Sequence, residues 1–209
     1  MSHLGMARLK KTLRILPDEP IEKRIADGLA RLVDAGRVAA WHEANAQHLS
    51  PTQAQVIAEL NRTPLRLSDV ATVLGVSTAT TSDAVRVLVQ KGLVDKAKDP
   101  NDGRAVRLEL TEAGRRLVPH AEHWRHIFVD AAGELDGDER EDLLDCVVKM
   151  MATLQRARCI SVARTCPTCR HFHAREDADG LHYCDAFEAE YGDTEIKTNC
   201  PAHDTKSAV

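Results

Sequence analysis

Apolar residues recur at helical spacing near the start of this chain. They stand three or four positions apart at Ile21, Ile25, Leu29 and Leu32, and the pattern continues to about Gln47. A period close to 3.6 residues is typical of an amphipathic helix with one apolar face. The pattern therefore predicts one long helix over residues 21–47.

A shorter helix is predicted next. Ser50 followed by Pro51 is typical of an N-cap and a first helical residue, because a serine oxygen accepts an amide hydrogen that the first turn leaves free. The apolar residues that follow keep the helical spacing until Pro64. We expect this helix to end near that proline, which cannot continue it.

Two still shorter helices are predicted after it. Ser68 is expected to cap a helix over residues 69–74, and Gly75 then supplies a tight turn. Ser77 is expected to cap a second helix that reaches about Lys91. Two short helices joined through a glycine form a helix-turn-helix.

A hairpin and two further helices complete this pattern. Short strand-like runs at 93–96 and 106–110 flank a turn-rich segment, so we expect a wing directly after the helix-turn-helix. Thr111 is expected to start a long helix to about residue 135. Asp138 then opens a final helix with an apolar stripe at Leu144, Val147, Met151 and Leu154.

Composition supports a mainly helical protein. Aromatic residues make up only 3% of the chain and apolar residues 43%, which suits amphipathic helices better than a sheet sandwich. We expect one main domain over residues 20–158 and a small satellite over residues 159–209. The sequence has no apolar stretch of about 18 residues and no signal-peptide pattern, so we expect a soluble, cytoplasmic protein without a membrane contact.

The satellite is defined by cysteines. Four of the six cysteines of the chain stand in it, at Cys166, Cys169, Cys184 and Cys200. Because the cytosol keeps thiols reduced, clustered cysteines there point to a metal rather than to disulfides. So short a polar segment could hardly fold without metal binding energy.

The residues leave the identity of this centre open. Zinc suits a small closed tetrahedral site, and an iron–sulfur cluster also uses four thiolates. His203 could replace one cysteine in a Cys₃His set. Cys184 stands alone, unlike the paired knuckles of zinc ribbons. Of the other cysteines, Cys146 is expected to be a small core residue of the last helix and Cys159 to have a structural role, and the remaining histidines of the tail are expected to face solvent.

The helix-turn-helix segment resembles the MarR family of winged-helix transcription factors. The resemblance is carried by residues 49–54, 67–77, 80–82, 91–94, 99–104 and 110–111. It implies a homodimer whose terminal helices pair across a two-fold axis, with half-sites one DNA turn, about 34 Å, apart. It also implies a pocket for a small-molecule effector. Asp83 and Gly103 depart from the basic residues usual at those positions, which implies weaker phosphate contacts.

The predicted helix and wing carry side chains suited to duplex DNA. The net charge of −4 argues against nucleic acid, but the segment 91–107 is locally basic. Val85 and Leu88 are expected to face inward, while hydroxyls and cations face DNA. Arg104 is expected to enter the minor groove. The predicted contacts are Ser77, Thr78, Thr80, Thr81, Ser82, Arg86, Lys96, Lys98, Arg104 and Arg107.

These features predict a DNA-binding transcriptional regulator, a repressor by type, whose cysteine centre senses redox state or iron. The alternative is a regulator with a purely structural zinc tail that recruits a protein partner and responds to a small aromatic ligand. An enzyme is not expected. A Cys-Pro-Thr-Cys sequence can imitate a thiol oxidoreductase, but the tail lacks the strand–helix–strand pattern of such enzymes.

Overall fold

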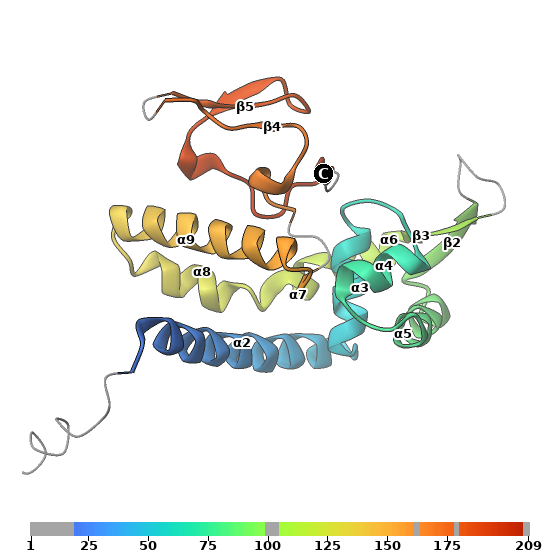
Figure 1. Cartoon of the computed structure of the whole chain (residues 1–209). Helices are drawn as coiled ribbons and strands as arrows, with labels where there is room; N and C mark the ends of the chain where they lie inside the picture. The colour runs from blue at the N-terminus through green and yellow to red at the C-terminus, as the bar shows by residue number, and fades with distance from the viewer. Residues whose placement is uncertain (1–18, 99–104, 161–163, 178–179, 207–209) are drawn as a thin grey trace, which may run out of the picture. The chain divides into compact units, whose positions relative to one another are not determined.

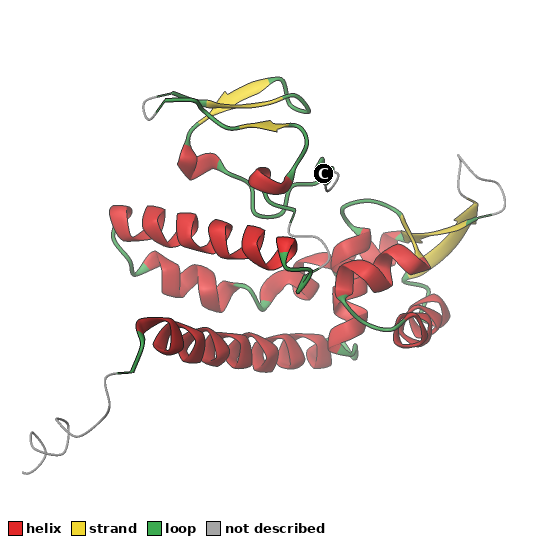
Figure 2. Cartoon of the chain, viewed as in Figure 1, coloured by secondary structure: helices red, strands yellow, loops and turns green. Residues whose placement is uncertain are grey.

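The computed structural model describes residues 19–98, 105–160, 164–177 and 180–206 (Figure 1). It forms two compact units, divided between Ala39 and Ala40, each of which is described by itself. The described residues are mainly helical, with two small antiparallel sheets (Figure 2). The predicted fold class, mainly α with a small β wing, is therefore confirmed. No described helix is both long and apolar enough to span a membrane.

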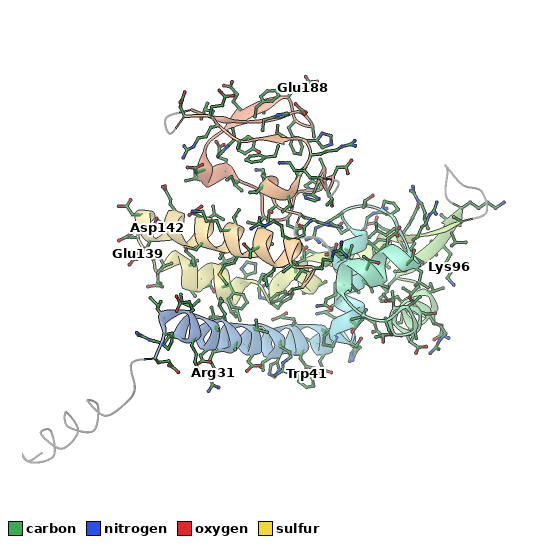
Figure 3. The ribbon with its side chains drawn as sticks, viewed as in Figure 1. Arg31, Trp41, Lys96, Glu139, Asp142 and Glu188 are labelled. Atoms are coloured by element: carbon green, nitrogen blue, oxygen red, sulfur yellow. The ribbon has the colours of Figure 1, made fainter. Side chains whose placement is uncertain are left out.

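Helix α2 (Ile21–Ala46) begins and ends where the apolar periodicity predicts. It crosses the division between the two units. Large apolar side chains are nevertheless exposed along it, including Leu32, Val38 and Trp41. Figure 3 labels Trp41 on this helix. An isolated amphipathic helix cannot bury such a face, so these side chains are available to a partner.

The helix-turn-helix consists of α4 (Leu67–Leu74) and α5 (Thr78–Gln90), preceded by α3 (Pro51–Leu60). A reciprocal capping box at Ser50 starts α3, as predicted. Gly75 ends α4 with a φ of +65°, a left-handed conformation that glycine adopts without steric cost.

The expected cap of α4 is wrong. Helix α4 begins at Leu67, with Arg66 in the N-cap position, so Ser68 lies inside its first turn. There the Ser68 hydroxyl donates to the Asp69 carboxylate instead of capping the backbone. Ser77 does cap α5, because the amide of Thr80 donates to its side-chain oxygen.

The wing is a three-stranded antiparallel sheet in the order β1 (Leu65–Arg66), β3 (Val106–Leu110), β2 (Val94–Lys98). In its hairpin Val94 pairs with Leu110 and Lys98 with Val106. The two-residue strand β1 was not predicted, because two residues carry no periodicity. The largest fully buried side chains beneath this sheet and the three helices are Val56, Ile57, Val70, Leu88 and Val94.

The predicted long helix over residues 111–135 is wrong. The segment forms three helices instead, α6 (Glu112–Arg116), α7 (Val118–His123) and α8 (His126–Gly133). Pro119 explains the first break, because it has no amide hydrogen to donate and its ring collides with the carbonyl of the preceding turn. Gly114 is needed in α6, since a Cβ there would lie 2.1 Å from the Leu93 carbonyl oxygen.

Helix α9 (Gly137–Arg156) starts one residue before Asp138, the residue expected to open it, and Asp136 caps it through a capping box with Glu139. The predicted apolar stripe is only partly covered. Val147 and Leu154 are exposed, whereas Val148 and Ala152 are the buried residues of this helix.

The tail that follows α9 is a small sheet with two turns of 3-10 helix. Its strands β4 (Phe172–His173), β5 (His182–Cys184) and β6 (Ala189–Tyr191) form an antiparallel meander. The helical turns η1 (Cys166–Thr168) and η2 (Asp193–Glu195) both contact α9. The tail is thus seated against the last long helix of its own unit.

Candidate functional site

The exposed face of α5 carries short polar side chains and one cation. Thr78, Thr80, Ser82 and Arg86 are all exposed, whereas Val85 and Leu88 are buried, as predicted. Arg86 pairs with Asp83 at 3.4 Å, and both side chains are largely exposed. A surface ion pair of this kind is worth little, so Arg86 can exchange its carboxylate for a phosphate at small cost.

Two of the predicted contacts on α5 have structural roles. The Ser77 hydroxyl accepts the Thr80 amide as N-cap and lies 2.8 Å from the Thr80 hydroxyl. Thr81 is fully buried, and its hydroxyl donates to the Ser77 carbonyl at 3.1 Å. A side chain inside the domain cannot reach DNA, so Thr81 is corrected from a contact residue to a core residue.

The wing contributes further cations. Lys96 and Lys98 are exposed on β2, and Figure 3 labels Lys96 on the hairpin. Arg107 lies on β3 with its side chain only 25% exposed, and it pairs with Glu109 at 3.3 Å. Its Nε atom is buried without a hydrogen-bond partner. Arg107 is therefore held in the sheet, while the predicted contact Arg104 lies outside the described residues.

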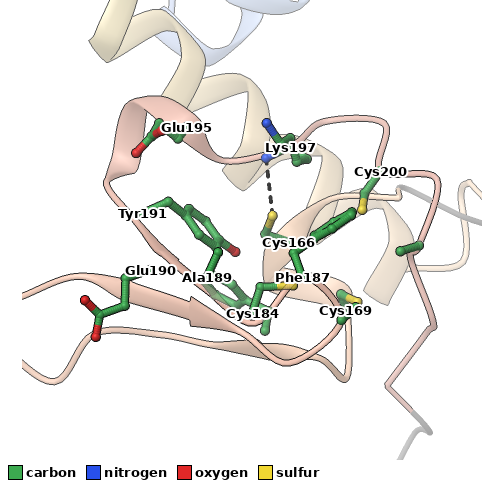
Figure 4. A pocket seen from close by; sticks show the side chains of 13 residues that line it. Cys166, Cys169, Cys184, Phe187, Ala189, Glu190, Tyr191, Glu195, Lys197 and Cys200 are labelled. Atoms are coloured by element: carbon green, nitrogen blue, oxygen red, sulfur yellow. Dashed lines mark hydrogen bonds between the residues drawn. The ribbon is translucent and has the colours of Figure 1, made fainter.

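The second candidate site is a pocket lined by all four cysteines of the tail. Cys166 and Cys169 come from the η1 knuckle, Cys184 from the end of β5, and Cys200 from the loop after η2. Each is buried, with 6–8% of its surface exposed. Figure 4 shows the four thiols around one pocket, with the rings of Phe187 and Tyr191 beside them.

Backbone amides are directed at these sulfurs. The amide of Lys197 donates to Cys166 Sγ at 3.2 Å, and the amide of Asp204 donates to Cys169 Sγ at 3.4 Å. A backbone hydrogen bond from Ala202 also favours the thiolate of Cys200, although burial and the neighbouring cysteines raise the pKa of that thiol. Donors of this kind stabilise the deprotonated form of a ligand sulfur.

The pocket is larger than a single bound ion requires. Its volume is about 370 Å³, and most of its surface is contributed by apolar atoms. Among the described residues, no group of three or more His, Cys, Asp or Glu side chains is arranged to hold one metal ion. Burial, followed by the nearby Cys166, also raises the pKa of the Tyr191 hydroxyl at the edge of this pocket.

The structure places the other candidate ligands elsewhere. His203 does not line the cysteine pocket, and its Nε2 atom lies 2.9 Å from the Thr168 hydroxyl. Cys146 and Cys159 are both exposed and also lie outside the pocket, so the expectation that Cys146 is a core residue is wrong.

One structural residue was missed by sequence reasoning. His182 is buried rather than solvated, with its ring centroid 5.0 Å from that of Phe172. The Arg175 amide donates to its Nδ1 atom, and its Nε2 atom lies 2.7 Å from an Asp193 carboxylate oxygen. The hydrogen bond with His182, together with the charged side chain of Arg175, lowers the pKa of the Asp193 carboxyl. The one signal in the sequence is that His182 stands two residues before Cys184, because residues two apart in a strand face the same side of the sheet.

A partly buried ion pair connects the tail to α3. Arg164 Nη1 lies 3.4 Å from Glu59 Oε2, and the two side chains are 16% and 14% exposed. The Arg164 carbonyl accepts the amide of Cys200 at 3.0 Å. A cysteine of the pocket is therefore two contacts away from the first helix of the winged-helix core.

Comparison with known proteins agrees with this architecture. Residues 49–105 match the model of the MarR family. The transcriptional regulator AdcR of Streptococcus pneumoniae is 32% identical over 70 residues, which cover 34% of this chain and 48% of AdcR. This chain thus spans about half the length of that relative.

Solved structures resemble the chain more extensively. A MarR transcriptional regulator from Methanosarcina mazei Go1 superposes with a TM-score of 0.55 at 21% identity, covering 65% of this chain and 99% of that one. The regulator BldR from Sulfolobus solfataricus gives 0.53 at 20% identity, covering 63% of this chain and 95% of its own. The chain has the MarR-type winged-helix fold. Apo MarR from E. coli is similar, with a TM-score of 0.51 at 18% identity over 63% of this chain and 96% of that one. The segment matched by the MarR family model ends before the four cysteines.

Proposed function

We propose that this protein is a sequence-specific DNA-binding transcriptional regulator, a repressor by type, that acts as a cytoplasmic homodimer. The observation that carries the proposal is the exposed polar face of α5, with Thr78, Thr80, Ser82 and Arg86, directly before the basic strand β2 of a wing. Hydroxyls and a guanidinium on a helix of this size can reach phosphates and base edges in a major groove.

Exposed apolar side chains support the homodimer. They occur on α2, on α8 at Ile127 and Val129, and on α9 at Leu143, Val147 and Leu154. Burying such side chains against a second copy gains free energy in proportion to the apolar area removed from water. A closed two-fold dimer would cover the same face on both copies and present two α5 helices to one duplex.

Selection of bound duplexes from a random pool, followed by titration of the best sequence at fixed salt, tests this proposal. Arg86→Ala is expected to weaken binding of the selected site by about 1 to 3 kcal/mol if the guanidinium contacts a base or phosphate. Arg140→Ala, which removes an exposed arginine of α9, is the matched control and is expected to leave affinity unchanged. Failure to enrich any sequence would contradict the proposal.

We propose further that the four-cysteine pocket is a metal centre, with zinc or an iron–sulfur cluster bound by Cys166, Cys169, Cys184 and Cys200. The burial of all four thiols around one pocket and the backbone amides directed at them support it. Backbone amides stabilise ligand thiolates by donating hydrogen bonds to their sulfurs. The tail also has few apolar side chains, so metal binding would supply free energy for its folding.

The same centre is proposed to regulate DNA binding. Cys200 contacts Arg164, and Arg164 contacts Glu59 on α3. Binding or loss of the metal can therefore change the position of α3 through these contacts. Operator affinity is therefore expected to differ between metal-loaded and metal-free protein. Equal affinity of the two forms would favour the alternative, in which a structural zinc tail recruits a protein partner and a small aromatic effector controls the winged-helix domain.

A further inference from the structure

We infer that the occupant of the four-cysteine pocket is an iron–sulfur cluster and not a single zinc ion. This inference rests on the metal centre proposed above and names its chemistry. It follows from the absence of a single-ion ligand group among the described residues, from the size of the pocket and from the nature of its walls.

The cysteines of the described residues do not form a ligand group for one ion. Zinc binds thiolate sulfur at about 2.3 Å, so four sulfurs around one ion stand only about 3.8 Å apart at the corners of a tetrahedron. The four cysteines all belong to the described residues, yet no three of them are arranged to share one ion. In a cluster the cysteines bind different iron atoms, and the inorganic sulfides keep the thiolates farther apart.

The volume of the pocket also favours a cluster. A closed zinc site leaves no space between the sulfurs beyond the ion itself. The pocket that the four thiols line together with nine other residues has a volume of about 370 Å³. One water takes about 30 Å³ in the liquid, so the pocket has room for a polynuclear centre with its sulfides.

The apolar wall of the pocket favours a cluster as well. Apolar side chains line most of it, among them Phe172, Phe187 and Tyr191. Apolar surroundings limit the access of solvent, and amides that donate to the sulfurs disperse the negative charge of a cluster held by four thiolates. The amides of Lys197 and Asp204 supply two such donors.

Anaerobic reconstitution of the full-length chain tests the inference. One sample receives ferrous iron and sulfide, a second receives zinc, and bound iron, sulfide and zinc are then measured together with the ultraviolet–visible spectrum. The expected result is a brown protein that absorbs near 400 nm and holds iron and sulfide in equal amounts. Cys184→Ala is expected to lose the band and the iron, whereas Cys146→Ala and Cys159→Ala retain both because these cysteines lie outside the pocket.

The outcomes separate the two proposals. A colourless protein that takes up one zinc per chain through the same four cysteines, and no sulfide, would overturn the cluster and leave the metal centre standing. Binding of neither iron nor zinc would overturn both. Because the wild-type measurement needs no variant, a cysteine variant that fails to fold does not affect the result.

Discussion

Glu59 on α3 pairs with two arginines, Arg62 and Arg164, and its replacement gives the sharpest stability prediction. Its Oε1 atom lies 2.6 Å from Arg62 Nη1, and its Oε2 atom lies 3.4 Å from Arg164 Nη1. The side chains of Glu59, Arg62 and Arg164 are 14%, 13% and 16% exposed. Solvent therefore screens these pairs far less than it screens surface pairs. Glu59→Gln leaves Arg164 without its carboxylate and Arg62 with only Glu122, at 3.4 Å.

The expected cost follows from this burial. Removing one partner of a buried ion pair typically costs about 3 to 5 kcal/mol, and the small remaining exposure places Glu59→Gln at about 2 to 4 kcal/mol. For a chain of this size that corresponds to a fall in Tm of about 4 to 16 °C. Arg164→Met should cost less, about 1 kcal/mol, because Glu59 keeps its closer partner Arg62.

Urea unfolding of the metal-loaded chain, followed by helical circular dichroism, measures both values. Glu112→Gln is the matched control, since this glutamate is 77% exposed and its pair with Arg116 is a surface pair. The reasoning would be refuted if Glu59→Gln changed the free energy of unfolding no more than Glu112→Gln does, or if Arg164→Met cost more than Glu59→Gln.

Three further predictions follow from local geometry. Gly114→Ala should destabilise the fold by about 1 to 3 kcal/mol, because the new Cβ would meet the Leu93 carbonyl oxygen. In Gly28→Ala, the control, the new Cβ meets open space on α2, so the free energy of unfolding should rise by about 0.5 to 1 kcal/mol. Equal urea midpoints for these two variants would contradict this account. Ser50→Ala should cost about 1 kcal/mol by removing the capping box of α3, and an unchanged midpoint would show that the cap contributes nothing. Lys96→Ala should weaken DNA binding uniformly across sequences and reduce the salt dependence by about one phosphate contact, measured by titration at several salt concentrations; a loss confined to one sequence would reassign Lys96 to base recognition.

Local sequence patterns predicted most of the winged-helix half. The period of α2, the Ser-Pro start of α3, the glycine turn and the buried positions of α5 all follow from interactions within a few residues. The errors arise where tertiary structure determines whether a helix continues or a side chain is buried. The amphipathic pattern after Thr111 continues through Pro119, but Pro119 cannot donate a hydrogen bond to the preceding turn, so α6 ends at Arg116 and a new helix, α7, starts at Val118. Thr81 has the same chemistry as its exposed neighbour Thr80, and only packing shows that it is buried.

In the tail, too, local sequence predicted some features and tertiary structure determined the others. The Cys-Pro-Thr-Cys knuckle and the later cysteines were recognisable as a group from residue type alone. Their convergence on one pocket depends on strand pairing between Phe172 and Cys184 and on the return of the chain to Cys200, neither of which leaves a periodic pattern. The place of His182 beside the rings of Phe172 and Tyr191 depends on the same sheet.

Footprinting of the full-length chain on a selected duplex tests the central claim most directly. The account predicts protection of a two-fold symmetric site whose half-sites are centred about one helical turn, 10 to 10.5 base pairs, apart. It also predicts that Arg86→Ala loses this protection at protein concentrations where Arg140→Ala retains it. Protection without sequence preference, or no protection at low salt, would contradict the assignment of this protein as a DNA-binding regulator.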